Sequence, residues 1–103
     1  MTPRKVDDNQ AEIVKVLREI GATVWSTAAI GNGFPDLAVG FAGVNTLLEV
    51  KDGDKPPSRQ RLTPAEFRFH TTWKGQIAIV TSPGEAVDVV RQRALGLGGN
   101  LIA

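Results

Sequence analysis

Apolar residues recur along the chain with two spacings, one typical of helices and one typical of strands. Positions 13 to 20 carry them every three or four residues, which predicts an amphipathic helix that ends at Gly21. Other apolar residues form short runs with the length and composition of strands. These runs span residues 23–26, 37–41, 46–50 and 76–80.

Two further helices are marked by capping residues. Thr63 and Glu66 have the spacing of a capping box, and Pro64 suits a first helical turn, which together predict a helix from about Pro64 to Trp73. The segment 82–85 repeats this pattern and predicts a third helix that continues to about residue 93.

The predicted order of elements is therefore α-β-β-β-α-β-α. A right-handed crossover through the second helix places the last strand parallel to the strand over 46–50. We expect an α/β fold in which helices flank a mixed four-stranded sheet. A chain of 103 residues supports one domain, which we place at 1–95, and the glycine-rich end over 96–103 should be a loosely held tail.

Composition narrows the class of protein without identifying it. Hydrophobic residues make up 42% of the chain and charged residues 22%, as in an ordinary globular protein. No apolar stretch approaches the roughly eighteen residues of a membrane helix, and cysteine and a signal-peptide core are missing, so we expect a cytoplasmic protein without a membrane partner. A net charge of +1 does not by itself indicate nucleic-acid binding.

The second and third apolar runs predict a β-hairpin, because only a short glycine-containing segment separates them. Whether the loop has two residues, Gly43-Val44, or four, Ala42 to Asn45, the same register places Asp36 opposite Lys51. Because side chains alternate between faces along a strand, Asp36, Glu49 and Lys51 project from one side of the hairpin. The two carboxylates are then diagonal neighbours that can converge on one ion.

Two carboxylates and an amine in this arrangement are the groups that a metal-dependent phosphodiester hydrolase uses. Mg²⁺ and Mn²⁺ bind a few carboxylates together with waters and phosphate oxygens. An ion held by Asp36 and Glu49 would acidify a bound water and neutralise charge on the phosphate, while Lys51 would orient the nucleophile or stabilise the transition state. The alternative is a solvated ion pair between Glu49 and Lys51 without chemistry.

In these motifs the chain resembles the PD-(D/E)xK nuclease superfamily, and within it the small stand-alone VRR-NUC domains of phages and bacteria. The resemblance runs from Asn9 to about Ala86. It rests on Asn9–Val14, Gly33–Leu37, Leu48–Gly53 and Leu62–Pro64. It implies a restriction-endonuclease-like core and a Mg²⁺- or Mn²⁺-dependent endonuclease that cuts branched DNA, such as Holliday junctions or flaps. It also implies a homodimer in the cytoplasm of a bacterium or a phage-infected host cell.

The resemblance also implies roles for the central residues. Asp36, Glu49 and the backbone carbonyl of Val50 correspond to metal ligands, and Lys51 corresponds to the catalytic lysine. A second function remains open, in which the same scaffold is a non-catalytic DNA-binding or assembly module and the acids only pair with Lys51.

Two acidic residues at the edge of the proposed site have competing interpretations. Glu12 matches a position that many superfamily members place close to the metal, yet Asn9 and Glu12 also have the spacing of a capping box. Relatives often carry glutamine at the position of Glu66, so Glu66 either lies near the site or only caps its helix.

The segment 52–61 contains glycine, prolines and charged residues without apolar periodicity, and we expect it to be a mobile loop. It follows Lys51 directly and would approach the DNA, with Lys55, Arg59 and Arg61 contacting phosphates in a salt-dependent manner. A solvated surface loop without such a role is the alternative.

The chain has a single histidine, His70, in an aromatic stretch of the second predicted helix. We expect it to be a packed or surface residue outside the site, because the proposed chemistry already has a lysine and a metal-bound water.

Overall fold

The computed structural model describes residues 5–96, and the side chains of residues 8–96 apart from Arg59. Its elements, in chain order, are α1 (Lys5–Glu19), β1 (Thr23–Ser26), the 3₁₀ helix η1 (Ala28–Ile30), β2 (Leu37–Phe41), β3 (Val44–Val50), α2 (Pro57–Gln60), α3 (Pro64–Thr72), β4 (Ile77–Val80) and α4 (Pro83–Ala94). The predicted α-β-β-β-α-β-α order is confirmed, with η1 and α2 as additional short helices. Apart from Gly96, the predicted tail lies outside the described residues.

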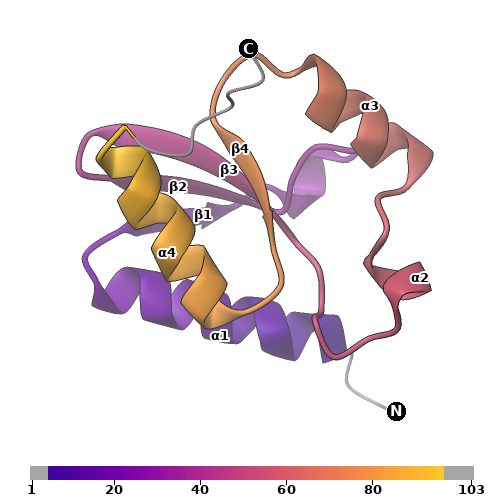
Figure 1. The fold of residues 1–103 in the computed structure, drawn as a ribbon, viewed down its shortest axis with the longest axis horizontal. Helices are drawn as coiled ribbons and strands as arrows, with labels where there is room; N and C mark the ends of the chain where they lie inside the picture. Colours follow the sequence, from indigo (N-terminus) through magenta and orange to yellow (C-terminus); the bar gives the residue numbers. More distant parts are fainter. Residues whose placement is uncertain (1–4, 97–103) are drawn as a thin grey trace.

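The strands form one mixed sheet in the order β1-β2-β3-β4. β1, β2 and β3 are antiparallel neighbours, and β4 runs parallel to β3, as the crossover rule predicts. Helices α1 and α4 pack against each other beside the sheet, whereas α2 and α3, which connect β3 to β4, lie apart from them at one end of the molecule (Figure 1). Helices α2 and α3 thus lie outside the layer that α1 and α4 form (Figure 1).

The core lies between the sheet and the pair α1 and α4. Helix α1 supplies Ile13 and Leu17, one turn apart and fully buried, and α4 supplies Ala86 and Val90 with the same spacing. The strands contribute most of the rest of the buried cluster, including Leu37, Val39, Leu48, Val50 and Val80. This packing fixes the sheet and, with it, the positions of residues at the strand ends.

The register of the β2–β3 hairpin differs from the predicted one by two residues. Leu37 pairs with Leu48, so continuing this register by one residue places Asp36 opposite Glu49. The cause is the turn, which consists of Ala42 and Gly43 with φ angles of 51° and 83° and is thus centred one residue earlier than predicted. A slip of two residues keeps every side chain on its face, so the two acids still share one side and are now directly opposed.

One of the two interpretations of Glu12 is wrong, and one loop prediction is wrong in part. Helix α1 begins at Lys5, so Asn9 lies inside the helix and does not cap it, and the Asn9–Glu12 capping box is absent. The segment 52–61 is not entirely a loop, because it contains the short helix α2, with Pro57 at the first helical position that proline favours.

In the part of the chain that the structure describes, no helix has the length and apolar character that a membrane crossing requires.

Candidate active site

Asp36 lies directly before β2 and is fixed by hydrogen bonds on both sides of its peptide. The Thr27 hydroxyl donates to the Pro35 carbonyl at 2.6 Å, and the Thr27 N–H donates to the Asp36 carbonyl at 2.8 Å. The Asp36 Oδ2 atom accepts a hydrogen bond from the Val50 N–H at 2.8 Å. The Pro35-Asp36 segment thus holds the Asp36 carboxylate against the end of β3, and the Val50 N–H sets the orientation of this carboxylate.

Glu49 faces Asp36 from β3 and is only 2% exposed. The pKa of Glu49 is raised to about 9, first by burial and then by the neighbouring carboxyl groups of Asp36 and Glu66, whereas Lys51 lowers it by less. The Oε1 atom of Glu49 is buried and has no hydrogen-bond partner among the described residues. A buried acid with this pKa and an unsatisfied oxygen is typical of a functional site.

Lys51 follows Glu49 by two residues and is held by two carboxylates. Its Nζ lies 2.9 Å from Glu66 Oε1 and 3.7 Å from Glu49 Oε2. The structure therefore brings Asp36, Glu49 and Lys51 together at the end of the hairpin that lies away from its turn. They project from the same face, as the alternation of side chains along the strands predicts.

Glu66 caps its helix and also lies at the site, so it combines the two roles that the sequence analysis gave as alternatives. Its Oε1 accepts a hydrogen bond from the Thr63 N–H at 2.8 Å, and the Thr63 hydroxyl accepts one from the Glu66 N–H, so the predicted capping box is confirmed. The same Oε1 binds Lys51 Nζ. Burial by itself would raise the pKa of Glu66, but the hydrogen bonds from Lys51 and Thr63 outweigh burial and lower it.

His70 lies at the site, contrary to our expectation. It is one helical turn after Glu66 on α3, and its Nε2 is 3.9 Å from Glu49 Oε1. Its side chain is 10% exposed, and burial lowers the pKa of the imidazole. The sequence contained a signal for this position, because residues four apart on a helix face the same side, and Glu66 was already a candidate.

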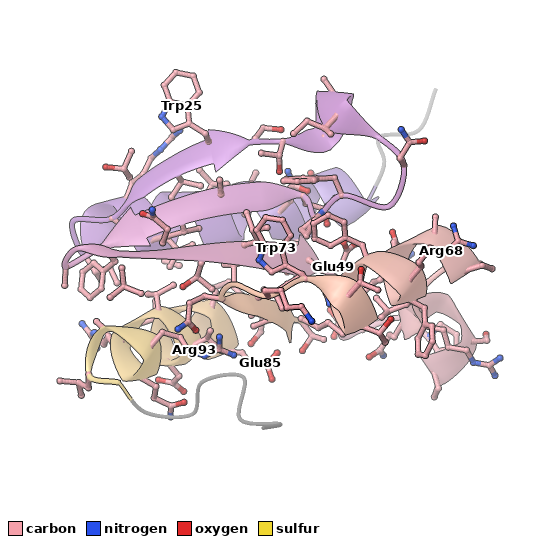
Figure 2. The ribbon with its side chains drawn as sticks, turned by 90° about the horizontal axis from the view of Figure 1, so that it is seen from above. Trp25, Glu49, Arg68, Trp73, Glu85 and Arg93 are labelled. Atoms are coloured by element: carbon pink, nitrogen blue, oxygen red, sulfur yellow. The ribbon has the colours of Figure 1, made fainter. Side chains whose placement is uncertain are left out.

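Helix α3 is held over the site by an aromatic cluster of Phe34, Phe69 and Trp73. The rings of Phe34 and Phe69 meet edge to face with centroids 4.9 Å apart, and those of Phe69 and Trp73 stack at 5.0 Å. In the view of Figure 2, Trp73 lies over the strands of the sheet. The aromatic cluster thus ties the helix that carries Glu66 and His70 to the loop that carries Asp36.

Gly33 completes this contact between the loop and α3. A Cβ on Gly33 would collide with the backbone carbonyl of Ala65, in the first turn of α3, and Gly33 has a φ angle of 83°. Gly33→Ala is therefore expected to lower the free energy of unfolding by about 2 kcal/mol or more, because it adds a backbone clash to the cost of a positive φ. Chemical denaturation measures this change.

Gly31→Ala is the matched control for Gly33→Ala. Gly31 also has a positive φ, 73°, but a Cβ there meets no atom within 4 Å. The difference between the two variants isolates the contact with α3, and equal destabilisation would contradict the close packing of Gly33 on that helix.

Asn9 is a structural residue that the sequence interpretation missed. Its side-chain amide donates hydrogen bonds to the Lys51 carbonyl at 3.0 Å and to the Thr81 carbonyl at 3.4 Å. Asn9 thereby fastens α1 to the chain just beyond the ends of β3 and β4, and it fixes the backbone of Lys51.

The predicted peripheral residues are less closely connected with the site. Glu12 is exposed on α1, and the hydrogen bonds and ion pairs found in residues 8–96 do not include its side chain. Lys55 is half-buried and Arg61 is exposed, on either side of α2, whereas the side chain of Arg59 lies outside the described part of the chain. Val50 lies between Glu49 and Lys51 with its N–H bound to Asp36.

The residues present fit a divalent ion held by few protein ligands. Within the described range, no three side chains of His, Cys, Asp or Glu are grouped to hold a metal ion. A metal here would therefore be held by the opposed carboxylates of Asp36 and Glu49, with a backbone carbonyl, waters and phosphate oxygens as further ligands, as is usual for Mg²⁺. A cation would also relieve the repulsion that raises the pKa of Glu49 and would satisfy its unpartnered oxygen.

The mixed four-stranded sheet with its flanking helices is the α/β fold that we predicted. A solved structure described as a "VRR_NUC domain" has this fold, with a TM-score of 0.63 over 86% of this chain and 97% of that chain, at 23% sequence identity. The predicted likeness to VRR-NUC domains is thus confirmed at the level of the fold. No family model matches the sequence, and no curated protein matches it.

Proposed function

We propose that this protein is a metal-dependent deoxyribonuclease that hydrolyses phosphodiester bonds. The observation that carries the proposal is the direct opposition of Asp36 and Glu49 beside the Lys51 ammonium, with one Glu49 oxygen buried and unpartnered in the described structure. Two acids in this arrangement repel each other when both are ionised, unless a cation lies between them, and this requirement is typical of a metal site.

Each residue of the proposed site has a distinct task. Asp36, oriented by the Val50 N–H, and Glu49 would hold Mg²⁺ or Mn²⁺ together with the Val50 carbonyl. When bound, such an ion supplies an acidified water and positive charge at the phosphate. Lys51, held by Glu66, would place its ammonium where it orients the attacking water or stabilises the negative charge that grows on the phosphate.

For the substrate, we propose branched DNA such as a Holliday junction or a flap, cut by a homodimer in the cytoplasm. The support is the likeness to VRR-NUC domains, together with one candidate site per chain, because paired cuts in two strands require two sites related by symmetry. Lys55, Arg59 and Arg61 are the proposed phosphate contacts, since α2 follows Lys51 after a few residues.

Cleavage of a panel of linear, flapped and four-way DNA tests this proposal. We expect cutting in Mg²⁺ or Mn²⁺ and none in excess chelator. Asp36→Asn should lower cleavage by about 10²-fold or more, because it removes a ligand charge while an amide oxygen still accepts from Val50 N–H. Isothermal titration measures the accompanying loss of Mn²⁺ affinity. If every substrate stays intact and calorimetry detects no divalent ion bound to the wild-type protein, the nuclease proposal fails.

The second candidate is a non-catalytic DNA-binding or assembly module on the same fold. The 2.9 Å pair between Lys51 and Glu66 favours it, because a lysine held in this way also serves as a structural ion pair. This candidate predicts DNA binding that neither requires a divalent ion nor leads to cleavage, so the same panel distinguishes the two.

A further inference from the structure

Two buried side-chain polar atoms in the described part of the chain have no hydrogen-bond partner, and they face each other. Glu49 Oε1 and His70 Nε2 are buried, and neither has a hydrogen bond within the described part of the protein. They are 3.9 Å apart, with side-chain exposures of 3% and 10%. Leaving a buried donor or acceptor unsatisfied is costly, so a native protein rarely retains two of them at one place without a use.

The separation is about 1 Å longer than a hydrogen bond between nitrogen and oxygen. A small rotation of either side chain would close it and satisfy both atoms. The atoms are almost inaccessible to solvent, so water is a poor substitute for the direct contact.

His70 lies on the same helix as Glu66, the residue that binds Lys51. Glu66 binds Lys51 from one turn of α3, and His70 faces Glu49 from the next. Glu49 Oε2 already faces Lys51, at 3.7 Å, so the two oxygens of this carboxyl group have different neighbours. The carboxyl group of Glu49 thus lies between a lysine on its own strand and an imidazole on the helix.

We propose that His70 is a positioning residue that hydrogen-bonds Glu49 Oε1 through Nε2 and fixes the orientation in which Glu49 binds a divalent ion. The proposal rests on the proposed function, because it assigns His70 to the same metal site. An imidazole nitrogen can form one hydrogen bond with a carboxyl oxygen, which is what the two facing atoms lack. Residues that orient metal ligands in this way contribute to metal affinity although they do not touch the metal.

The hydrogen bond itself can be tested in the metal-free protein. Because His70 is the only histidine in the sequence, nuclear magnetic resonance of ¹⁵N-labelled protein shows a single imidazole. We expect one slowly exchanging proton between Nε2 and Oε1, whichever of the two groups carries it, and its loss in both Glu49→Ala and His70→Phe. A wild-type protein without this resonance would overturn the contact.

The positioning role is tested by Mn²⁺ affinity, measured by calorimetry on His70→Phe and His70→Gln. Phenylalanine keeps a ring beside Phe69 but has no hydrogen-bonding nitrogen, so we expect affinity to fall by about 10–100-fold with little change in melting temperature. Glutamine offers a side-chain N–H and should restore part of the affinity. Thr71→Ala is the control, because the hydrogen bonds of the Thr71 hydroxyl to other described residues are to carbonyls of its own helix, so Mn²⁺ affinity should stay at the wild-type value.

The outcomes separate this inference from the proposed function. If the wild-type protein binds Mn²⁺ and His70→Phe binds it equally well, the positioning role is wrong and the metal site stands. If the wild-type protein binds no Mn²⁺, the proposed function and the role of His70 in it both fail, while the resonance experiment still decides whether the two side chains are bonded.

Discussion

Lys51→Ala is expected to lower the rate of DNA cleavage by about 10²–10³-fold, the loss typical when a group that stabilises transition-state charge is removed. The ammonium is held at the site by Glu66, and no second lysine or arginine forms an ion pair with Glu49 or Glu66 among the described residues. Single-turnover kinetics at saturating Mn²⁺ measures the effect on the chemical step without the effect on metal binding.

The fold should survive this substitution. Glu66 keeps its hydrogen bond from the Thr63 N–H, so α3 keeps its cap, and the lysine is not part of the buried cluster. DNA binding should also persist. Lys74→Ala, which removes an exposed lysine just after α3, is the matched control and should cut at the wild-type rate. Cleavage by Lys51→Ala at the rate of Lys74→Ala would show that Lys51 is a structural ion-pair partner and not a catalytic residue.

The correct part of the site prediction came from the alternation of side chains between the two faces of a strand. Asp36, Glu49 and Lys51 share one face for any register that differs by an even number of residues, so a two-residue error did not separate them. The register itself depended on a turn that the sequence did not reveal, because Ala42 adopts a positive φ that is unusual for alanine. Apolar periodicity predicts which face a residue occupies better than it predicts which residue stands opposite.

Helix ends were predicted well only where the cap residues bind locally. Thr63 with Glu66 forms the predicted capping box, and the Ser82 hydroxyl accepts from the Glu85 N–H in the same way. Asn9 has the same spacing to Glu12, yet its amide binds two carbonyls that lie 42 and 72 residues away. Local spacing cannot distinguish a cap from a long-range contact, because the residue types are the same in both.

His70 shows that local sequence can also miss a residue of the functional site. Its sequence neighbours are aromatic and suggest a packed residue, and the side chain is indeed packed. Its packing partner is a buried acid on β3, which only the β3–α3–β4 crossover brings near. The centre of the site could be predicted from one hairpin, whereas the residues that orient it come from a helix whose docking depends on the tertiary fold.

In the absence of divalent ions, Glu49 is expected to make the protein less stable as pH rises from about 4.5 to about 9. The folded state holds the Glu49 proton up to a pKa of about 9, whereas the unfolded chain releases it near the ordinary value of 4.5. In this window the folded state binds more protons, so unfolding releases a proton and a higher pH favours it. The contribution of Glu49 to the free energy of unfolding is fully present below about pH 4.5 and is lost by about pH 9. Glu66 acts in the opposite direction, because its pKa is lowered and its contribution is lost as pH falls.

Glu49→Gln isolates the contribution of Glu49, because glutamine resembles the protonated acid and does not titrate. We expect the variant to match the wild type near pH 4.5 and to exceed it by about 2 kcal/mol at pH 9, as is common when a poorly compensated buried charge is replaced by a neutral group. Denaturant titrations of both proteins across this range measure the difference. Mn²⁺ should reverse the order, because metal binding requires the ionised carboxylate and stabilises only the protein that can supply it. Parallel stability profiles for the two proteins, unchanged by Mn²⁺, would mean that Glu49 is neither a buried titrating acid nor a metal ligand.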